Sequence, residues 1–138
     1  MKRILLLIVL FSVFSCKQKI TDTDISNLNG YWEIEKVELP DGDKKEYKVN
    51  ETIDFFKIEE NKGFRKKVMP QLDGTYLTND VQEDVTVVLK DGDASLQYKT
   101  TYASWNEEII ELTKDKLVVK NEQEIEYYYK RPAKFSVK

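Results

Sequence analysis

The sequence predicts an all-β domain in which short strands run antiparallel to their neighbours along the chain, as a closed barrel or a sandwich. Three observations predict it. From residue 30 onward, short runs rich in β-branched and aromatic residues follow one another, no window has the helical period, and turn-forming residues separate the runs. Even spacing over about 100 residues with short connections is typical of such a meander.

Eight to ten strands are expected, and the turns between them are chemically specific. Segments 40–43, 61–63, 73–74 and 91–93 supply the Asp, Asn, Gly and Pro residues that tight or left-handed backbone favours. The candidate strands are residues 30–39, 44–49, 52–59, 63–69, 74–78, 84–90, 94–102, 107–113, 116–120 and 124–131.

Composition excludes several function classes. At 138 residues the chain has room for one domain. It contains no histidine, which excludes Ser-His-Asp and Cys-His catalytic sites and histidine-containing zinc sites. The net charge is -3, and an acidic chain argues against nucleic acid as a partner. Cys16 is the one cysteine, so no intramolecular disulfide can form.

The first fifteen residues are typical of a secretory signal. Lys2 and Arg3 precede an apolar run over 4–14, and a small residue, Ser15, precedes Cys16. As a helix this run would be about 16 Å long, about half of what a bilayer needs, so a permanent transmembrane helix is the weaker interpretation. The end of the run, Val-Phe-Ser-Cys at 13–16, resembles the lipobox of bacterial lipoproteins.

This resemblance implies a lipid anchor on Cys16. Residues 1–15 would be a lipoprotein signal peptide, and Cys16 would carry a diacylglyceryl group on sulfur and a further acyl chain, such as palmitate, on its amine. The alternative is an ordinary signal with an incidental cysteine. Residues 16–27 are polar and are expected to form a flexible lipidated tether before the domain at 28–138. Lys17 after the cysteine indicates the outer membrane of a bacterial envelope.

Alternation assigns faces to the later strands and places an arginine at the end of an inward row. An inward guanidinium needs a partner, and an indole ring is a good one. Trp32, at the start of the first strand, would lie next to Arg131 in a closed barrel with an even number of strands. The expected inward rows are Leu96, Tyr98, Thr100 and Tyr102, and Ile125, Tyr127, Tyr129 and Arg131.

The first and last strands resemble those of bacterial lipocalin-like lipoproteins, within the calycin barrels. The matching residues are Gly30-Tyr31-Trp32 and the segment 127–131, which ends in Arg131. The resemblance implies an eight-stranded up-and-down β-barrel that Gly30, Trp32 and Arg131 close at one end. It also implies that a small hydrophobic ligand enters at the other end.

Chain direction in such a barrel decides which loops surround the entrance. Segments 103–106 and 121–123 would lie at the open end, and segments 91–93 and 114–115 at the closed end. Four aromatic residues near the entrance are candidate ligand contacts because their rings provide contact area. The alternative is that each is an ordinary core or interface residue of a strand. These residues are Tyr98, Tyr102, Trp105 and Tyr127.

Other constellations favour no chemistry. The acidic pairs 41/43, 59/60, 91/93 and 107/108 fall in predicted turns or at strand ends, where carboxylates are normally solvated, and calcium would need more ligands. The charge runs 65–67 and 122–126 are expected to be solvated faces. We therefore expect no catalytic residue, no metal site and no cofactor.

Two functions from different classes remain. The first is a lipid-anchored envelope protein that binds a small hydrophobic molecule non-covalently. The second is an envelope module with a filled barrel that contacts a protein or glycan. An internal cavity of about 300 Å³ or more would favour the first, and a filled interior the second.

Overall fold

The computed structural model describes residues 17–48 and 50–133, so the predicted signal peptide and Cys16 lie outside the described residues. A short 3-10 helix, η1 (Asp24–Leu28), precedes ten strands. No helix in the described ranges is long and apolar enough to cross a membrane. The strands are β1 (Gly30–Glu38), β2 (Lys44–Glu46), β3 (Ile53–Glu59), β4 (Lys62–Pro70), β5 (Tyr76–Thr78), β6 (Glu83–Lys90), β7 (Asp93–Lys99), β8 (Ser104–Leu112), β9 (Lys116–Asn121) and β10 (Glu126–Lys130).

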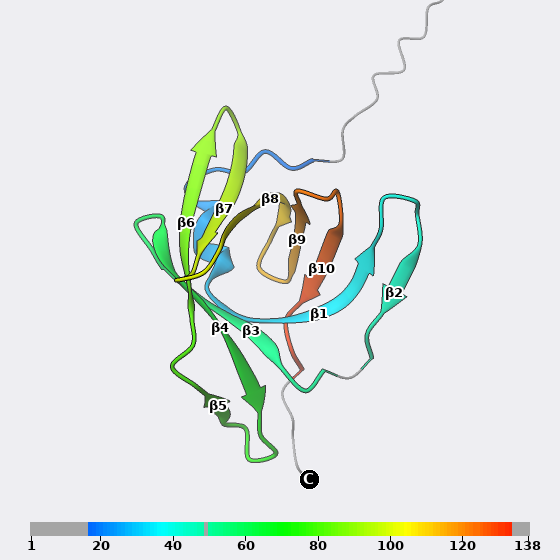
Figure 1. Ribbon diagram of the computed structural model, residues 1–138, viewed down its shortest axis with the longest axis vertical. Helices are drawn as coiled ribbons and strands as arrows, with labels where there is room; N and C mark the ends of the chain where they lie inside the picture. The colour runs from blue at the N-terminus through cyan, green and yellow to red at the C-terminus, as the bar shows by residue number, and fades with distance from the viewer. Residues whose placement is uncertain (1–16, 49, 134–138) are drawn as a thin grey trace, which may run out of the picture.

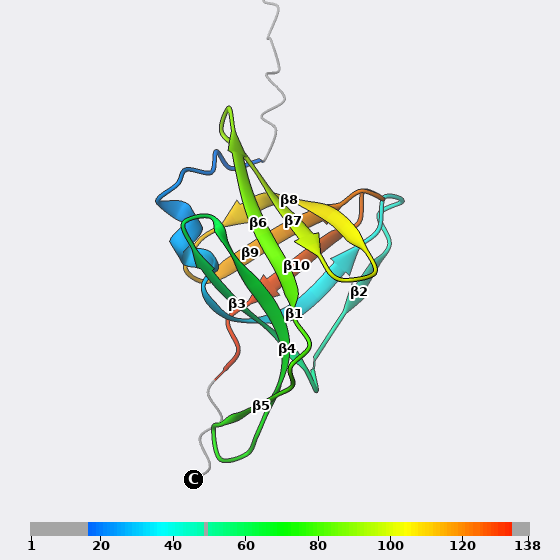
Figure 2. The same cartoon turned by 60° about the vertical axis from the view of Figure 1, so that its left-hand side comes forward.

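The strands form one antiparallel sheet that closes on itself (Figures 1 and 2). Strands β6 to β10 pair in chain order, β4 joins β6 to β3, and β3 pairs with β1. The last strand, β10, pairs back with β1 and completes a circuit of eight strands. Strands β2 and β5 add short pairs to β1 and β4. The predicted up-and-down barrel is confirmed, and the sandwich is excluded.

Strand β1 bends away from β3 halfway along its length, as its curved ribbon in Figure 1 shows. Its first three residues pair with β3, whereas 36–38 pair with β2 on the same edge. An irregularity in the β1–β10 pairing between Ile34 and Lys36 sets Glu35 apart as an extra residue. The carbonyl of Glu35 accepts a hydrogen bond of 2.9 Å from the Tyr47 backbone N–H. The β2 segment therefore continues the wall where β3 leaves it.

A single hydrophobic cluster fills the barrel. It contains residues from both ends of the chain and from most of the barrel strands, so closing the circuit is what assembles it. Three aromatic side chains are almost completely buried, those of Trp32, Phe56 and Tyr98. The cluster consists of Ile20, Ile25, Leu28, Trp32, Phe56, Ile58, Val85, Val87, Ala94, Leu96, Tyr98, Ile109, Leu112, Leu117, Val119 and Tyr129.

Arg131 seals one end of the barrel, as the sequence predicted. Its guanidinium carbon lies 3.6 Å from the centre of the Trp32 ring. The same guanidinium donates hydrogen bonds to three backbone carbonyls, those of Lys114 (2.8 Å), Tyr31 (3.0 Å) and Asn27 (2.6 Å). Arg131 therefore joins the β8–β9 turn, the start of β1 and the helix η1 at what we call the closed end.

Gly30 is required at the closed end for two reasons. Its φ of +107° is a conformation that side chains with a Cβ rarely adopt, and a Cβ there would lie 3.2 Å from Arg131 Nη1. Trp32 is fixed from the other side, because its indole N–H donates to the Leu28 carbonyl at 2.8 Å. Figure 2 shows η1 on the left of the barrel and the β7–β8 turn on the right, which marks the opposite, open end.

The prediction that residues 16–27 form a flexible tether is wrong for the described residues 17–27. Ile20 is 2% exposed and Ile25 is 4% exposed, because both side chains join the barrel core. The apolar residues of segment 17–27 are too few to form a periodic pattern in the sequence. The folded unit therefore begins before residue 28.

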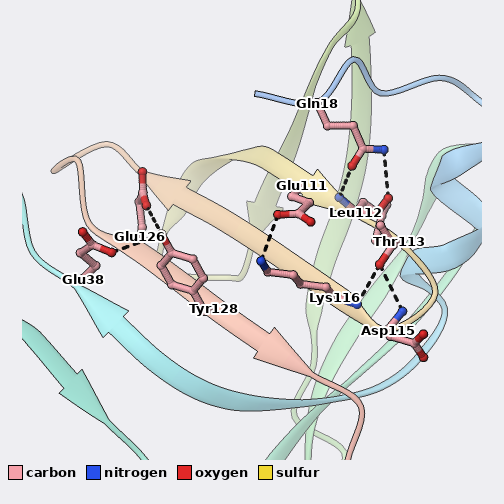
Figure 3. A network of polar contacts seen from close by, with 9 residues as sticks. All are labelled: Gln18, Glu38, Glu111, Leu112, Thr113, Asp115, Lys116, Glu126 and Tyr128. Carbon is pink, nitrogen blue, oxygen red and sulfur yellow. Dashed lines mark hydrogen bonds and ion pairs between the residues drawn. The ribbon is translucent and has the colours of Figure 1, made fainter. Parts of the chain in front are cut away.

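We call residues 17–23 the N-terminal strap, because they bind along β8 and the β6–β7 turn. The pairing of β8 with β9 shifts register between Ile109 and Glu111, and the Gln18 backbone N–H donates to the carbonyl of Ile110 at 3.0 Å. The Gln18 side chain both accepts from and donates to the backbone of Leu112 (2.9 and 3.1 Å; Figure 3). The Ile20 N–H donates to Gly92 at 3.0 Å. These bonds hold the strap against the barrel wall.

Candidate functional site

A pocket of about 300 Å³ lies at the open end of the barrel. It is bounded by the first residues of β8, the β9–β10 turn, and the inner faces of β4 and β10. Three of its residues are aromatic and the rest are polar or charged, so it is more polar than the sequence analysis predicted. The lining residues are Arg65, Lys67, Trp105, Asn106, Glu107, Asn121, Glu122, Gln123, Tyr127 and Tyr129.

Three of the four aromatic residues predicted to line the entrance lie in or beneath this open-end pocket. Trp105 and Tyr127 line it and are partly buried. Tyr98 lies beneath, with its ring stacked on that of Trp105 at 5.4 Å between centroids and 15° between planes. The Tyr127 hydroxyl accepts a hydrogen bond of 3.3 Å from the Asn121 side chain. Aromatic rings therefore form one wall of the pocket.

Tyr102, the fourth predicted contact, is misplaced by the sequence analysis. It is 97% exposed in the turn between β7 and β8, so it cannot line the pocket. The turn spans 100–103 and not 103–106, because the Thr100 hydroxyl accepts hydrogen bonds from the backbone N–H groups of Tyr102 (3.3 Å) and Ala103 (3.1 Å). A threonine can close a turn in this way without glycine or proline. Trp105 consequently belongs to β8 itself.

Arg65, on β4, is the centre of the pocket floor. Its guanidinium carbon lies 4.1 Å from the centre of the Tyr98 ring. Its Nε donates to Glu83 Oε2 at 2.7 Å, and its Nη2 donates to the same oxygen. Burial alone would lower the pKa of Arg65, but Tyr98, Asp54 and Glu83 outweigh it and raise that pKa. Arg65 therefore stays charged at any ordinary pH.

Three buried oxygens surround Arg65 without a hydrogen bond from any described residue. They are Asp54 Oδ1, Tyr98 Oη and Glu107 Oε1. Two of them have a cation nearby, since Lys67 Nζ lies 2.6 Å from Asp54 Oδ1 and Arg65 Nη1 lies 3.7 Å from Glu107 Oε1. The Lys67 ammonium already occupies Asp54 Oδ1, so Tyr98 Oη and Glu107 Oε1 are the two oxygens that retain an open acceptor site.

Burial shifts the acid–base behaviour of this floor. Burial raises the pKa of Glu107 above the usual glutamate range, although Arg65 opposes the shift. Burial also raises the pKa of Tyr98 well above its usual value, so this phenol is neutral. The floor thus combines a permanent cation, a neutral phenol and a carboxyl group whose pKa lies above that of an exposed glutamate.

Sequence reasoning missed this charged floor. The run 65–67 was expected to be a solvated face, but Arg65 and Lys67 both line the pocket, on the inner face of β4. The pair 107/108 was expected to be solvated, but Glu107 is 7% exposed, whereas Glu108 contacts Lys17 of the strap. Alternation along β4 and β8 was the available signal, because it separates these neighbours onto opposite faces.

A second hollow, of about 600 Å³, lies on the outer wall where β1, β2, β9 and β10 meet. Its floor is the Tyr128 ring, whose hydroxyl donates to Glu126 (2.6 Å) and contacts Glu38 (3.3 Å), and Lys116 pairs with Glu111 nearby (Figure 3). The side chains that line it are mostly charged, and no buried atom without a partner faces it among the described residues. It is larger but less distinctive than the open-end pocket, which we take as the candidate site.

In the described part of the chain, no group of three or more His, Cys, Asp and Glu side chains is placed to hold a metal ion. The side chains that line the open-end pocket offer aromatic contact, hydrogen bonding and ion pairing.

Comparison with known proteins places the fold. A family model described as "Lipocalin-like domain" matches residues 28–119. A lipocalin-like protein from Bacteroides uniformis has a similar crystal structure, with a TM-score of 0.50 and 14% identity over 77% of this chain and 99% of that chain. A protein from Bacteroides eggerthii is similar with a TM-score of 0.49 and 17% identity, over 76% and 99%. No curated protein matches the sequence.

Proposed function

The chain belongs to the lipocalin-like domain family, and on this premise we propose that it binds a small amphipathic molecule in the open-end pocket. Binding would be reversible, without a cofactor and without chemical change to the ligand. The observation that carries the proposal is a pocket of about 300 Å³ with an aromatic wall above buried, open hydrogen-bond acceptors. Ligand pockets commonly combine apolar walls with a few fixed polar groups.

The pocket supports an amphipathic ligand better than the purely hydrophobic one expected from the sequence. A flat apolar group would lie against Trp105 and Tyr127, where burial contributes about 25 cal/mol per Å² of apolar surface. A purely apolar molecule would also cover Arg65 and Glu107 and remove their water without replacing its hydrogen bonds. A polar group on the ligand avoids that cost.

We also propose that Cys16 is lipidated and anchors the protein in the bacterial cell envelope, at the outer membrane. The lipobox-like end of the apolar run supports this proposal. Lys17 is ion-paired to Asp93 at 2.8 Å and contacts Glu108, so the residue next to the cysteine is already bound to the barrel. The anchor would then hold the barrel close to the membrane, without a flexible spacer.

One observation favours a second function, a contact surface for another protein. The segment from β4 to β6 exposes several apolar side chains on the hairpin that extends beyond the barrel in Figures 1 and 2. Tyr76 of this hairpin stacks on Tyr31 at 4.0 Å between ring centroids. Exposed apolar groups on one projection favour a partner. They are Met69, Leu72, Leu77 and Val81.

Native mass spectrometry of the full-length protein, purified from the membranes of cells that express it naturally, tests the binding proposal. We expect an additional mass of a small molecule that mild activation releases. Trp105→Ala should lose this mass, because it removes the aromatic wall, whereas Tyr102→Ala should retain it. A wild-type protein without any bound mass, or a mass retained by Trp105→Ala, would contradict binding in the pocket.

The anchor is tested by membrane fractionation. Wild-type protein should incorporate labelled palmitate and sediment with the outer membrane, and Cys16→Ser should do neither. Label retained by the Cys16→Ser variant would refute the anchor without affecting the binding proposal.

A further inference from the structure

The charges around the open-end pocket do not cancel within the protein. Lys67 Nζ lies 2.6 Å from Asp54 Oδ1, and Arg65 is hydrogen-bonded twice to Glu83. These two pairs use both cations and two of the three acids of the pocket floor, which are Asp54, Glu83 and Glu107. Glu107 is the acid left over, and its nearest cation is the already paired Arg65, at 3.7 Å.

Glu107 is also the best-placed acceptor for a ligand. Its side chain lines the pocket although the residue is only 7% exposed. Its Oε1 is buried and has no donor in hydrogen-bond geometry among the described residues. A buried carboxylate oxygen is stabilised when a donor reaches it, and more so when the donor carries a positive charge.

The other walls of the pocket fit a cation. Trp105, Tyr127 and Tyr129 present aromatic rings to it, and ring faces attract ammonium groups within about 6 Å. Glu122 adds a second carboxylate at the rim, where its Oε1 accepts from the Asn106 N–H at 3.3 Å. An anionic ligand would face two carboxylates, and the two cations that could attract it are already paired.

We propose that the ligand is a small organic cation, an aromatic ring that bears a protonated amine, and that Glu107 is its counter-ion. This inference rests on the proposed binding function and assigns the ligand class of the same pocket. The ammonium group would donate to Glu107 Oε1, and the ring would lie against Trp105 and Tyr127. The protein's own cations would stay with Glu83 and Asp54.

The proposed ion pair makes the affinity for the amine depend on the ionisation of Glu107, and therefore on pH. Burial raises the pKa of Glu107, and Asp54 and Glu83 add to the shift, whereas Arg65 and the Tyr98 hydroxyl oppose it. Tyr127 and Tyr129 also face Glu107. A protonated Glu107 is neutral and cannot form the ion pair. The affinity for the amine should therefore rise with pH as Glu107 ionises. It should fall again when the amine itself loses its proton.

Isothermal titration calorimetry of the full-length protein in detergent, with three related probes, tests the proposal. The probes share a phenylethyl group and differ in the polar group that follows it: 2-phenylethylamine, 2-phenylethanol and the slightly larger 3-phenylpropanoate. We expect the amine to bind about tenfold or more tighter than the alcohol, because its hydrogen bond to Glu107 is charge-assisted, and the carboxylate to bind most weakly. Glu107→Gln should remove the preference for the amine, and Glu107→Asp should restore part of it.

Glu111→Gln is the matched control, because Glu111 lies on the same strand but pairs with Lys116 on the outer wall (Figure 3). It should keep the full preference, and the unfolding temperature of each variant shows that it is folded. Alcohol or carboxylate binding as tightly as the amine would overturn the ligand class and leave binding in the pocket intact. A preference unchanged in Glu107→Gln, or no binding of any probe, would overturn the proposal, whereas the co-purified mass tests the binding function separately.

Discussion

The two ends of the barrel use the same pair of groups for different purposes. At each end an arginine lies over an aromatic ring, Arg131 at 3.6 Å from Trp32 and Arg65 at 4.1 Å from Tyr98. At the closed end, the arginine donates to backbone carbonyls. At the open end, it is surrounded by carboxylates and leaves Glu107 only partly compensated. The partners, and not the arginine, distinguish the structural contact at the closed end from the proposed binding site at the open end.

The difference follows from what each partner can do. Backbone carbonyls are neutral, fixed by the fold and unaffected by pH, so Arg131 is locked once the strands have paired. Carboxylates titrate, can be shared and can accept more hydrogen bonds than one guanidinium supplies. The open end therefore retains acceptor sites that a ligand can use, and the closed end does not.

The largest effect should come from breaking the closed end. Arg131→Ala removes three charge-assisted hydrogen bonds and the contact with Trp32, and we expect the free energy of unfolding to fall by roughly 3–4 kcal/mol. Urea denaturation measures it. Lys130→Ala, at an exposed neighbouring position, should change it by less than about 0.5 kcal/mol. Equal losses in the two variants would show that Arg131 does not hold the ends of the barrel together.

The two ends also differ in how well the sequence predicts them. The residues of the closed end can be recognised from local sequence, because Gly30 and Trp32 are two positions apart and Arg131 ends an alternating strand. Alternation likewise predicted that Tyr98 and Tyr129 point inward, and both are buried. These features depend on one strand at a time, which is the range over which sequence patterns act.

The open end could not be predicted in the same way. Whether Arg65 is solvated or buried depends on Glu83 of β6 and Glu107 of β8, which only the register of three strands brings together. The position of the strap could not be predicted for the same reason. Ile20 belongs to no alternating run, and its contacts are with the β6–β7 turn and the core, which are distant in sequence. Long-range pairing decides such positions, and no local pattern encodes it.

A smaller, pH-dependent effect should distinguish the open end. The pKa of Glu107 is raised in the folded state, so its ionised form is less favourable there than in the unfolded chain. Its contribution to stability is therefore lost as pH rises from the usual glutamate range through the folded pKa. Glu107→Gln has no such loss, so its free energy of unfolding relative to that of wild type should rise between pH 4 and pH 8.

Denaturation of both proteins at several pH values measures this difference, in which the titration of other groups largely cancels. Arg131→Ala serves as the comparison, because its deficit should stay constant over the same pH range. A Glu107→Gln difference that does not change with pH would show that this carboxyl is as well solvated as an exposed one.

The smallest effect is expected at Tyr102, which lies in the turn between β7 and β8 and does not line the pocket. Its side chain is 97% exposed, so Tyr102→Ala should change the free energy of unfolding by less than about 0.5 kcal/mol and leave probe binding unchanged. Thr100→Val is the informative partner variant, because the Thr100 hydroxyl and not the tyrosine closes this turn. It should lower the free energy of unfolding by about 1 kcal/mol. A larger loss from Tyr102→Ala than from Thr100→Val would mean that the aromatic ring, after all, contributes to the open end.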